Sequence, residues 1–132
     1  IRYSYKTILD DDEIGVMAYN TETIIAEKYE TIIRRNIGTS RARDFYDLHV
    51  FYNLYKDSIN LEILKLAVTR IAKKRESLDT MSEWEEIIED MKVDTALKAL
   101  WKNYCENNTY ASEVSFENVM ETTLHIAEML GF

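Results

Sequence analysis

The sequence predicts a mainly α-helical fold, a compact bundle of about six helices preceded by a short N-terminal β-hairpin. Proline is absent and glycine occurs only three times in 132 residues, so little in the chain would break a helix. Apolar residues also recur at helical spacing along most of the chain. With 46% hydrophobic and 30% charged residues, this length suffices for one domain with its own core.

The first 19 residues are expected to form strands. Arg2–Ile8 and Ile14–Tyr19 alternate or run apolar, and the acidic DDDE between them is typical of a turn. A lone hairpin is only marginally stable, and the chain begins with Ile rather than Met. We therefore expect residues 1–132 to be a single helical C-terminal domain, with residues 1–19 completing a sheet of an absent N-terminal domain.

The first predicted helix begins with Asn20 or Thr21 as its N-cap and runs to about Ile37, where Gly38 supplies a stop. Its apolar stripe consists of Ile24, Ile25, Tyr29, Ile32 and Ile33.

Two more helices are predicted in the middle of the chain. Thr39 or Ser40 caps a helix that runs through about Tyr55. Ser58 or Asn60 caps the next helix, which ends near Lys74 and carries an apolar stripe of Leu61, Leu64, Val68 and Ile71.

Three helices are predicted in the C-terminal half. Ser82 and Glu85 have the spacing of a capping box, Asp94 can cap the following segment, and Ser115 can cap a last helix that stops before Gly131. The aromatic residues of this half fall at helical spacing and are expected in the core; they include Trp84, Trp101, Tyr104 and Phe116.

Charge is segregated along the chain. The net charge is −8, and residues 76–132 hold thirteen acids and three bases, or −10, while residues 1–75 hold thirteen bases and eleven acids, or +2. The acidic half is expected to repel RNA. The segment Lys28–Arg43 holds five bases and one acid, or +4, and is therefore the candidate anion site.

No stretch approaches the roughly 20 apolar residues of a membrane span, and the N-terminus lacks the layout of a signal peptide. The single cysteine, Cys105, excludes an internal disulfide and fits a reducing compartment. We expect a cytoplasmic protein that does not contact a membrane.

Three charged residues fall close to the apolar faces of their helices. At 100° per residue, Asp44 lies within the face formed by Phe45, Leu48 and the aromatic residues that follow, and Asp47 lies at its margin one turn later. In the preceding helix Lys28 lies on the flank of the apolar stripe. Carboxylates that only contact solvent would lie on the opposite face.

Two interpretations of these charges are open. Lys28 can form an internal ion pair with Asp44 or Asp47 that joins the two helices. Alternatively, Lys28 binds a triphosphate, the two aspartates hold Mg²⁺ or orient the reacting group, and Arg41 and Arg43 grip phosphates.

The segment AYNTETIIAEKYETIIRRN followed by TSRARDFYDLHVF resembles the C-terminal motifs of the AbiEii/AbiGii nucleotidyltransferase toxin family. The family pattern is an AEK triad in an aliphatic helix, then a helix with two spaced basic residues, an aspartate, two aromatic residues and a second aspartate. Ala26–Lys28 and Arg41–Asp47 match it over about residues 18–55.

The resemblance implies a bacterial enzyme with a polymerase-β-like core that transfers a nucleotide from an NTP with Mg²⁺, in several members onto tRNA. Such toxins serve in toxin–antitoxin operons and phage abortive infection, so a cognate antitoxin is implied. Lys28, Asp44 and Asp47 would be catalytic or supporting groups, and Arg41 and Arg43 would face phosphates or acceptor RNA.

The chain departs from the family in lacking its Gly-Ser motif and its D-x-D metal ligands, for which Asp10–Glu13 is not a substitute. We therefore expect this chain alone to be inactive and to bind neither Mg²⁺ nor NTP tightly. The alternative function is a non-enzymatic helical interaction module, whose acidic face would meet a basic partner such as an antitoxin or the protein's own N-terminal domain.

Overall fold

Helices dominate the chain, as predicted. The computed structural model describes residues 11–38 and 41–132, and within these ranges it has seven α-helices, three short 3₁₀ helices and no strand. The elements are α1 (Asp11–Arg35), η1 (Asn36–Gly38), α2 (Ala42–Tyr55), η2 (Lys56–Ser58), α3 (Leu61–Lys74), α4 (Leu78–Met81), α5 (Trp84–Val93), α6 (Thr95–Asn107), η3 (Thr109–Ala111) and α7 (Phe116–Leu130).

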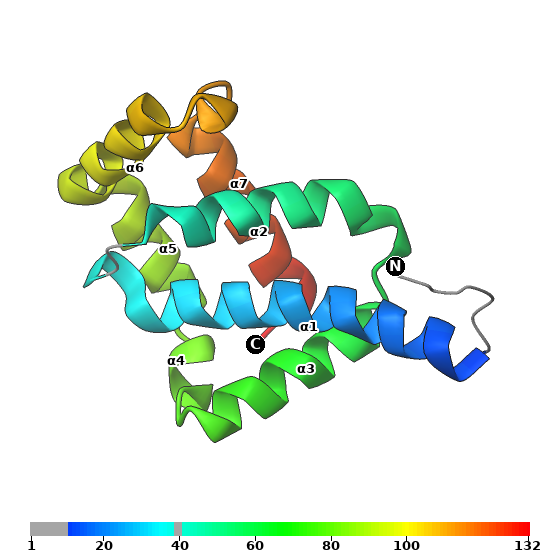
Figure 1. The fold of residues 1–132 in the computed structure, drawn as a ribbon. Coiled ribbons are helices and arrows are strands. Elements are labelled where there is room, and N and C mark those ends of the chain that lie inside the picture. The colour runs from blue at the N-terminus through cyan, green and yellow to red at the C-terminus, as the bar shows by residue number, and fades with distance from the viewer. Residues whose placement is uncertain (1–10, 39–40) are drawn as a thin grey trace.

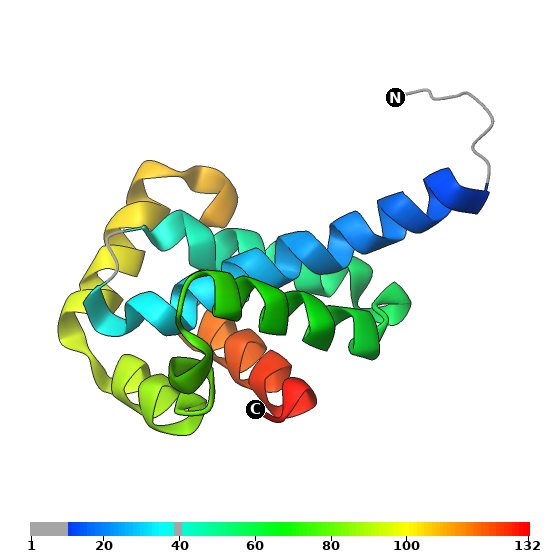
Figure 2. The ribbon, with the colours of Figure 1, turned by 90° about the horizontal axis from the view of Figure 1, so that it is seen from below.

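Helix α1 is the central element of the bundle. Figure 1 shows α1 and α2 side by side and running in opposite directions, with α3 packed along the other side of α1. Helix α7 crosses behind this pair and contacts α2, α3 and α5. Viewed from below, the first turns of α1 extend beyond the other helices (Figure 2).

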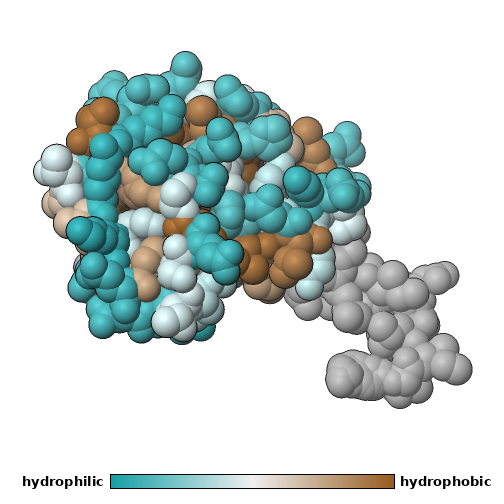
Figure 3. Space-filling model, turned by 90° about the horizontal axis from the view of Figure 1, so that it is seen from above, coloured by the Kyte–Doolittle hydropathy of each residue, from teal (hydrophilic) through white to brown (hydrophobic). Residues whose placement is uncertain are grey.

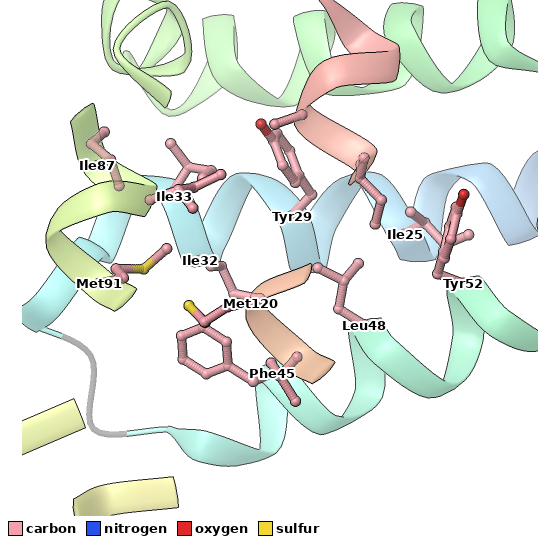
Figure 4. Close-up of a cluster of buried hydrophobic side chains, with 14 of the residues drawn as sticks. Ile25, Tyr29, Ile32, Ile33, Phe45, Leu48, Tyr52, Ile87, Met91 and Met120 are labelled. Carbon is pink, nitrogen blue, oxygen red and sulfur yellow. The ribbon is translucent and has the colours of Figure 1, made fainter. Parts of the chain in front are cut away.

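The core forms where α1, α2, α5 and α7 meet (Figure 4). Ile25, Tyr29, Ile32 and Ile33 of α1 are buried, which confirms the predicted stripe except for Ile24, whose side chain is exposed. Burying an isoleucine or leucine side chain contributes about 1.5–3 kcal/mol, so the α1 stripe is a major part of the folding free energy. Its burial also fixes which face of α1 points toward α2.

Three predicted helix N-termini are confirmed by their capping hydrogen bonds. Asn60 Oδ1 accepts from the Ile63 amide at 3.1 Å, and Asp94 Oδ2 accepts from the Leu97 amide at 2.8 Å. Ser115 forms a reciprocal capping box with Asn118. Each side-chain cap satisfies an amide that has no partner within its helix, which stabilises a helix by about 1 kcal/mol. The predicted stop is also present, with Gly131 in the left-handed region at φ 65°.

The predicted strand Ile14–Tyr19 is wrong, because these residues form part of α1. The predicted caps Asn20 and Thr21 therefore lie inside this helix. A short apolar run fits both a strand and a buried helical segment, so periodicity could not separate them. The other predicted strand, Arg2–Ile8, lies outside the described residues.

Two other boundary predictions are also wrong. After α1 the chain leaves the helix at Asn36, which takes the left-handed conformation at φ 53°, and not at Gly38. Ser82 forms no capping box with Glu85, since its hydroxyl donates to the Asp79 carbonyl at 3.1 Å and ends α4. Serine forms such local backbone bonds readily, so the spacing did not decide its role. The predicted caps Thr39 and Ser40 lie outside the described residues.

Two buried glutamates tie α1 to its neighbours, and the sequence pattern predicted neither. The Glu22 carboxylate accepts from the backbone amide of Asn60 at 2.6 Å, at the start of α3. Glu30 is fully buried and accepts from Arg34 at 2.8 Å, from Arg75 at 2.6 Å and from Ser77 at 2.6 Å. Because these donors satisfy both oxygens of Glu30, its charge is compensated.

Hydrophilic residues cover most of the face shown in Figure 3, with small hydrophobic patches between them. Among the described helices, none combines the length and the apolar character that crossing a bilayer requires.

We predict that Glu30→Gln lowers the free energy of unfolding by about 2 kcal/mol. The amide removes the negative charge that compensates Arg34 and Arg75, and it has one acceptor oxygen fewer for these arginines and the Ser77 hydroxyl. Urea unfolding followed by circular dichroism measures this change. The matched control is Glu27→Gln, at an exposed position of the same helix, with an expected change within about 0.5 kcal/mol. Equal effects of the two substitutions would contradict a stabilising role of the Glu30 network.

Candidate functional site

Lys28 lies on α1 and faces the N-terminal part of α2. Its ammonium is 3.0 Å from Asp44 Oδ1 and 3.3 Å from Asp47 Oδ2. The side chain is 28% exposed, between core and solvent. Because α1 and α2 pack side by side, the buried stripe of α1 sets the position from which Lys28 reaches both carboxylates.

Helix α2 places Asp44 and Asp47 one turn apart, as predicted. The Asp44 side chain is only 5% exposed and lies in the first turn of the helix, where the helix dipole favours a negative charge. Asp47 is 26% exposed, at the margin of the buried face. Asp44 Oδ2 is buried and accepts no hydrogen bond from the described residues, although Arg41 Nε lies 3.6 Å away.

The two predicted arginines flank the carboxylates. Arg41 Nε is 3.6 Å from Asp44 Oδ2, and Arg43 Nε is 3.7 Å from Asp47 Oδ2. Arg43 is 72% exposed, so most of its guanidinium faces solvent. The structure therefore brings together all five residues that the sequence singled out.

The cluster carries three positive and two negative side chains, a net charge of +1. A lysine ammonium has three N–H donors. Among the described residues, the Lys28 ammonium donates to Asp44 and forms an ion pair with Asp47. The carboxylates thus fix the ammonium and leave donor capacity for another acceptor. A fixed ammonium beside an exposed guanidinium is suited to an anion with several oxygens, such as a phosphate chain.

The same residues do not fit a resident divalent cation. Mg²⁺ prefers oxygen ligands in near-octahedral geometry, and here both carboxylates pair with lysine and arginine. In the part of the chain that the structure describes, no group of three or more acidic, histidine or cysteine side chains is placed to hold a metal. Asp44 and Asp47 instead contact the ammonium of Lys28 and the guanidinium groups of Arg41 and Arg43.

The sequence pattern missed the tyrosines beside this cluster. The Tyr46 ring lies 5.0 Å from that of Tyr110 and 6.3 Å from that of Tyr104. The pKa of Tyr104 is raised by burial, by its hydrogen bond to Tyr110 and by the negative charge of Asp47. The sequence offered one local sign of this arrangement: Tyr46 follows Arg43 by three residues, so the two side chains are neighbours on the same helix.

We predict that Asp44→Ala destabilises the fold more than Asp47→Ala, because Asp44 is the more buried partner and lies in the first turn of α2. We expect a loss of about 1–2 kcal/mol for Asp44→Ala and less than about 1 kcal/mol for Asp47→Ala. Urea unfolding of both variants measures the difference. A larger loss for Asp47→Ala would mean that the exposed carboxylate holds Lys28.

A family model described as "Nucleotidyl transferase AbiEii toxin, Type IV TA system" matches residues 1–122. Neither the comparison with curated proteins nor that with solved structures gave a match. The family match covers most of the chain and confirms the family that the sequence was predicted to resemble. The chain therefore belongs to the AbiEii family of nucleotidyltransferase toxins of type IV toxin–antitoxin systems.

Proposed function

We propose that the cluster of Lys28, Arg41, Arg43, Asp44 and Asp47 binds the triphosphate of an NTP during nucleotide transfer. The observation that carries this proposal is the Lys28 ammonium, fixed by two carboxylates at 3.0 and 3.3 Å between α1 and α2. Nucleotidyl transfer depends mainly on positioning and on stabilising charge around the phosphates, which a fixed cation provides.

The other four residues support this role. Asp44 and Asp47 orient Lys28 and limit the net charge of the cluster, and Arg41 and Arg43 face the phosphates of the NTP or of the acceptor RNA. The acceptor is a nucleic acid such as tRNA, and the product carries an added nucleotide. A cognate antitoxin opposes this activity in the cell.

The metal ions of the reaction need carboxylate ligands that these five residues do not supply. Mg²⁺, when bound to such ligands, would neutralise charge on the phosphates. Because the sequence also lacks the Gly-Ser motif and the D-x-D metal ligands of the family, we propose that the 132-residue chain by itself is inactive.

The experiment is transfer of each α-labelled NTP to total tRNA by the whole protein and by its Lys28→Ala variant. We expect Lys28→Ala to lower kcat/KM by at least about 100-fold, because it removes a cation that contacts the transferred phosphates. The matched control is Lys74→Ala, which removes an exposed lysine at the end of α3 and should leave transfer unchanged. Urea unfolding of each variant separates a lost site from a lost fold.

The second candidate, a non-enzymatic interaction module, is favoured by one observation: Lys28 and Asp44 form an ion pair that joins α1 and α2. A non-enzymatic module would transfer no nucleotide with or without Lys28. If the protein does transfer a nucleotide and Lys28 is only structural, Lys28→Ala would lower stability and leave transfer per folded molecule unchanged. If the Lys28→Ala variant labels tRNA at the same rate as the unsubstituted protein, the proposed role of Lys28 is overturned.

A further inference from the structure

An aromatic cluster lies beside the charged cluster and is built from α2, α6 and η3. The Tyr46 and Tyr110 rings meet edge to face with centroids 5.0 Å apart, and the Tyr104 and Tyr110 rings meet in the same way at 6.2 Å. The hydroxyl oxygens of Tyr104 and Tyr110 are 2.7 Å apart, within hydrogen-bond distance. We call Tyr46, Tyr104 and Tyr110 the tyrosine cluster.

The tyrosine cluster packs against buried residues of α6 and η3. The Trp101 ring lies 5.6 Å from that of Tyr104, and its Nε1–H donates to the Val114 carbonyl at 3.0 Å. Ala111, next to Tyr110 in η3, is fully buried. The buried Ala111 anchors the backbone next to Tyr110, and the Tyr110 ring packs against those of Tyr46 and Tyr104.

Tyr110 itself is 54% exposed, although it is a large aromatic residue. The core does not require it, because Ala111 and Trp101 already close this end of the bundle. A rigid, half-exposed tyrosine supported by other rings has aromatic surface on which a planar ligand can stack.

The tyrosine cluster is continuous with the charged cluster. Tyr46 directly precedes Asp47 and follows Arg43 by one turn, so Tyr46 and Arg43 are neighbours on the surface of α2. Arg43 pairs with Asp47 through Nε and is otherwise largely exposed. A ligand on the tyrosines would therefore have a cation within reach for a phosphate.

The surrounding charge does not repel such a ligand. The C-terminal half has three bases in all, and two of them, Lys98 and Lys102, lie on α6, which carries one acid, Glu106. Helices α5 and α7 of the same half are each net acidic. Helix α6 taken by itself is therefore net basic, although the half of the chain to which it belongs is acidic.

We infer that the tyrosine cluster stacks a nucleobase whose phosphate pairs with Arg43. This inference rests on the proposed function and extends it, because it assigns a base-binding site next to the triphosphate site. The nucleobase belongs either to the NTP or to an unpaired end of the acceptor RNA, since both offer the same aromatic ring and phosphate.

The test is a titration of the 132-residue chain, followed by its intrinsic fluorescence, with three probes: ATP, single-stranded oligo(A) and inorganic triphosphate. We expect Tyr110→Ala to weaken binding of ATP or of oligo(A) by about tenfold, as for loss of one base–aromatic stack. Binding of inorganic triphosphate, which has no base, should not change. The probe that is affected identifies whether the base comes from the NTP or from the acceptor.

Two variants make the test specific. Tyr110→Phe keeps the ring and loses the hydroxyl, so it should bind like the parent chain if stacking is the interaction. Tyr55→Ala removes a tyrosine of similar exposure at the other end of α2 and should have no effect. Arg43→Gln should weaken binding and reduce its dependence on salt.

Unchanged affinity of Tyr110→Ala for both ATP and oligo(A) would overturn the inference, as would failure of the parent chain to bind either probe. If inorganic triphosphate still binds in a Lys28-dependent way in those cases, the proposed function stands and only the base-binding site is refuted. The opposite result would refute the triphosphate site instead. In that result, substituting Lys28 does not change the affinity for inorganic triphosphate, whereas Tyr110→Ala still weakens binding of oligo(A).

Discussion

The candidate site depends on one interaction, the contact of the Lys28 ammonium on α1 with Asp44 and Asp47 on α2. The contact exists because the apolar stripe of α1 is buried and leaves Lys28 at its edge, facing the first turns of α2. Asp44, almost fully buried, requires a nearby cation, since an uncompensated carboxylate in this position would be strongly unfavourable. The geometry of the whole cluster follows from this requirement.

The fold does not need Lys28 to hold α1 in place. The buried stripe of α1, the Glu30 network with Arg75 and Ser77, and the contact of Glu22 with Asn60 already fix α1 against α3 and the core. Lys28 instead compensates the buried carboxylate of Asp44 within an arrangement that these other contacts already fix. Two carboxylates hold its ammonium at the edge of the core, where it is still partly exposed to solvent.

Local signals predicted much of this structure, and long-range contacts account for what they missed. The caps Asn60, Asp94 and Ser115 act within a few residues, so the sequence shows them directly. The strand predicted at Ile14–Tyr19 failed because a short apolar run has no period of its own. Glu30 was missed because its partners Arg75 and Ser77 lie more than forty residues away, and the contact of Tyr46 with Tyr104 and Tyr110 likewise depends on how α2 meets α6.

The most direct test of the account is calorimetric titration of the 132-residue chain with inorganic triphosphate, for the parent sequence and for Lys28→Met. Methionine keeps a flexible apolar side chain and removes the charge, so packing beside Ile32 should be retained. We expect the 132-residue chain to bind triphosphate and its folded Lys28→Met variant to bind it at least about tenfold more weakly, a difference of about 1.4 kcal/mol. Equal affinity of the two chains for triphosphate would show that Lys28 is only a structural ion-pair partner, which is the result that would contradict its proposed role.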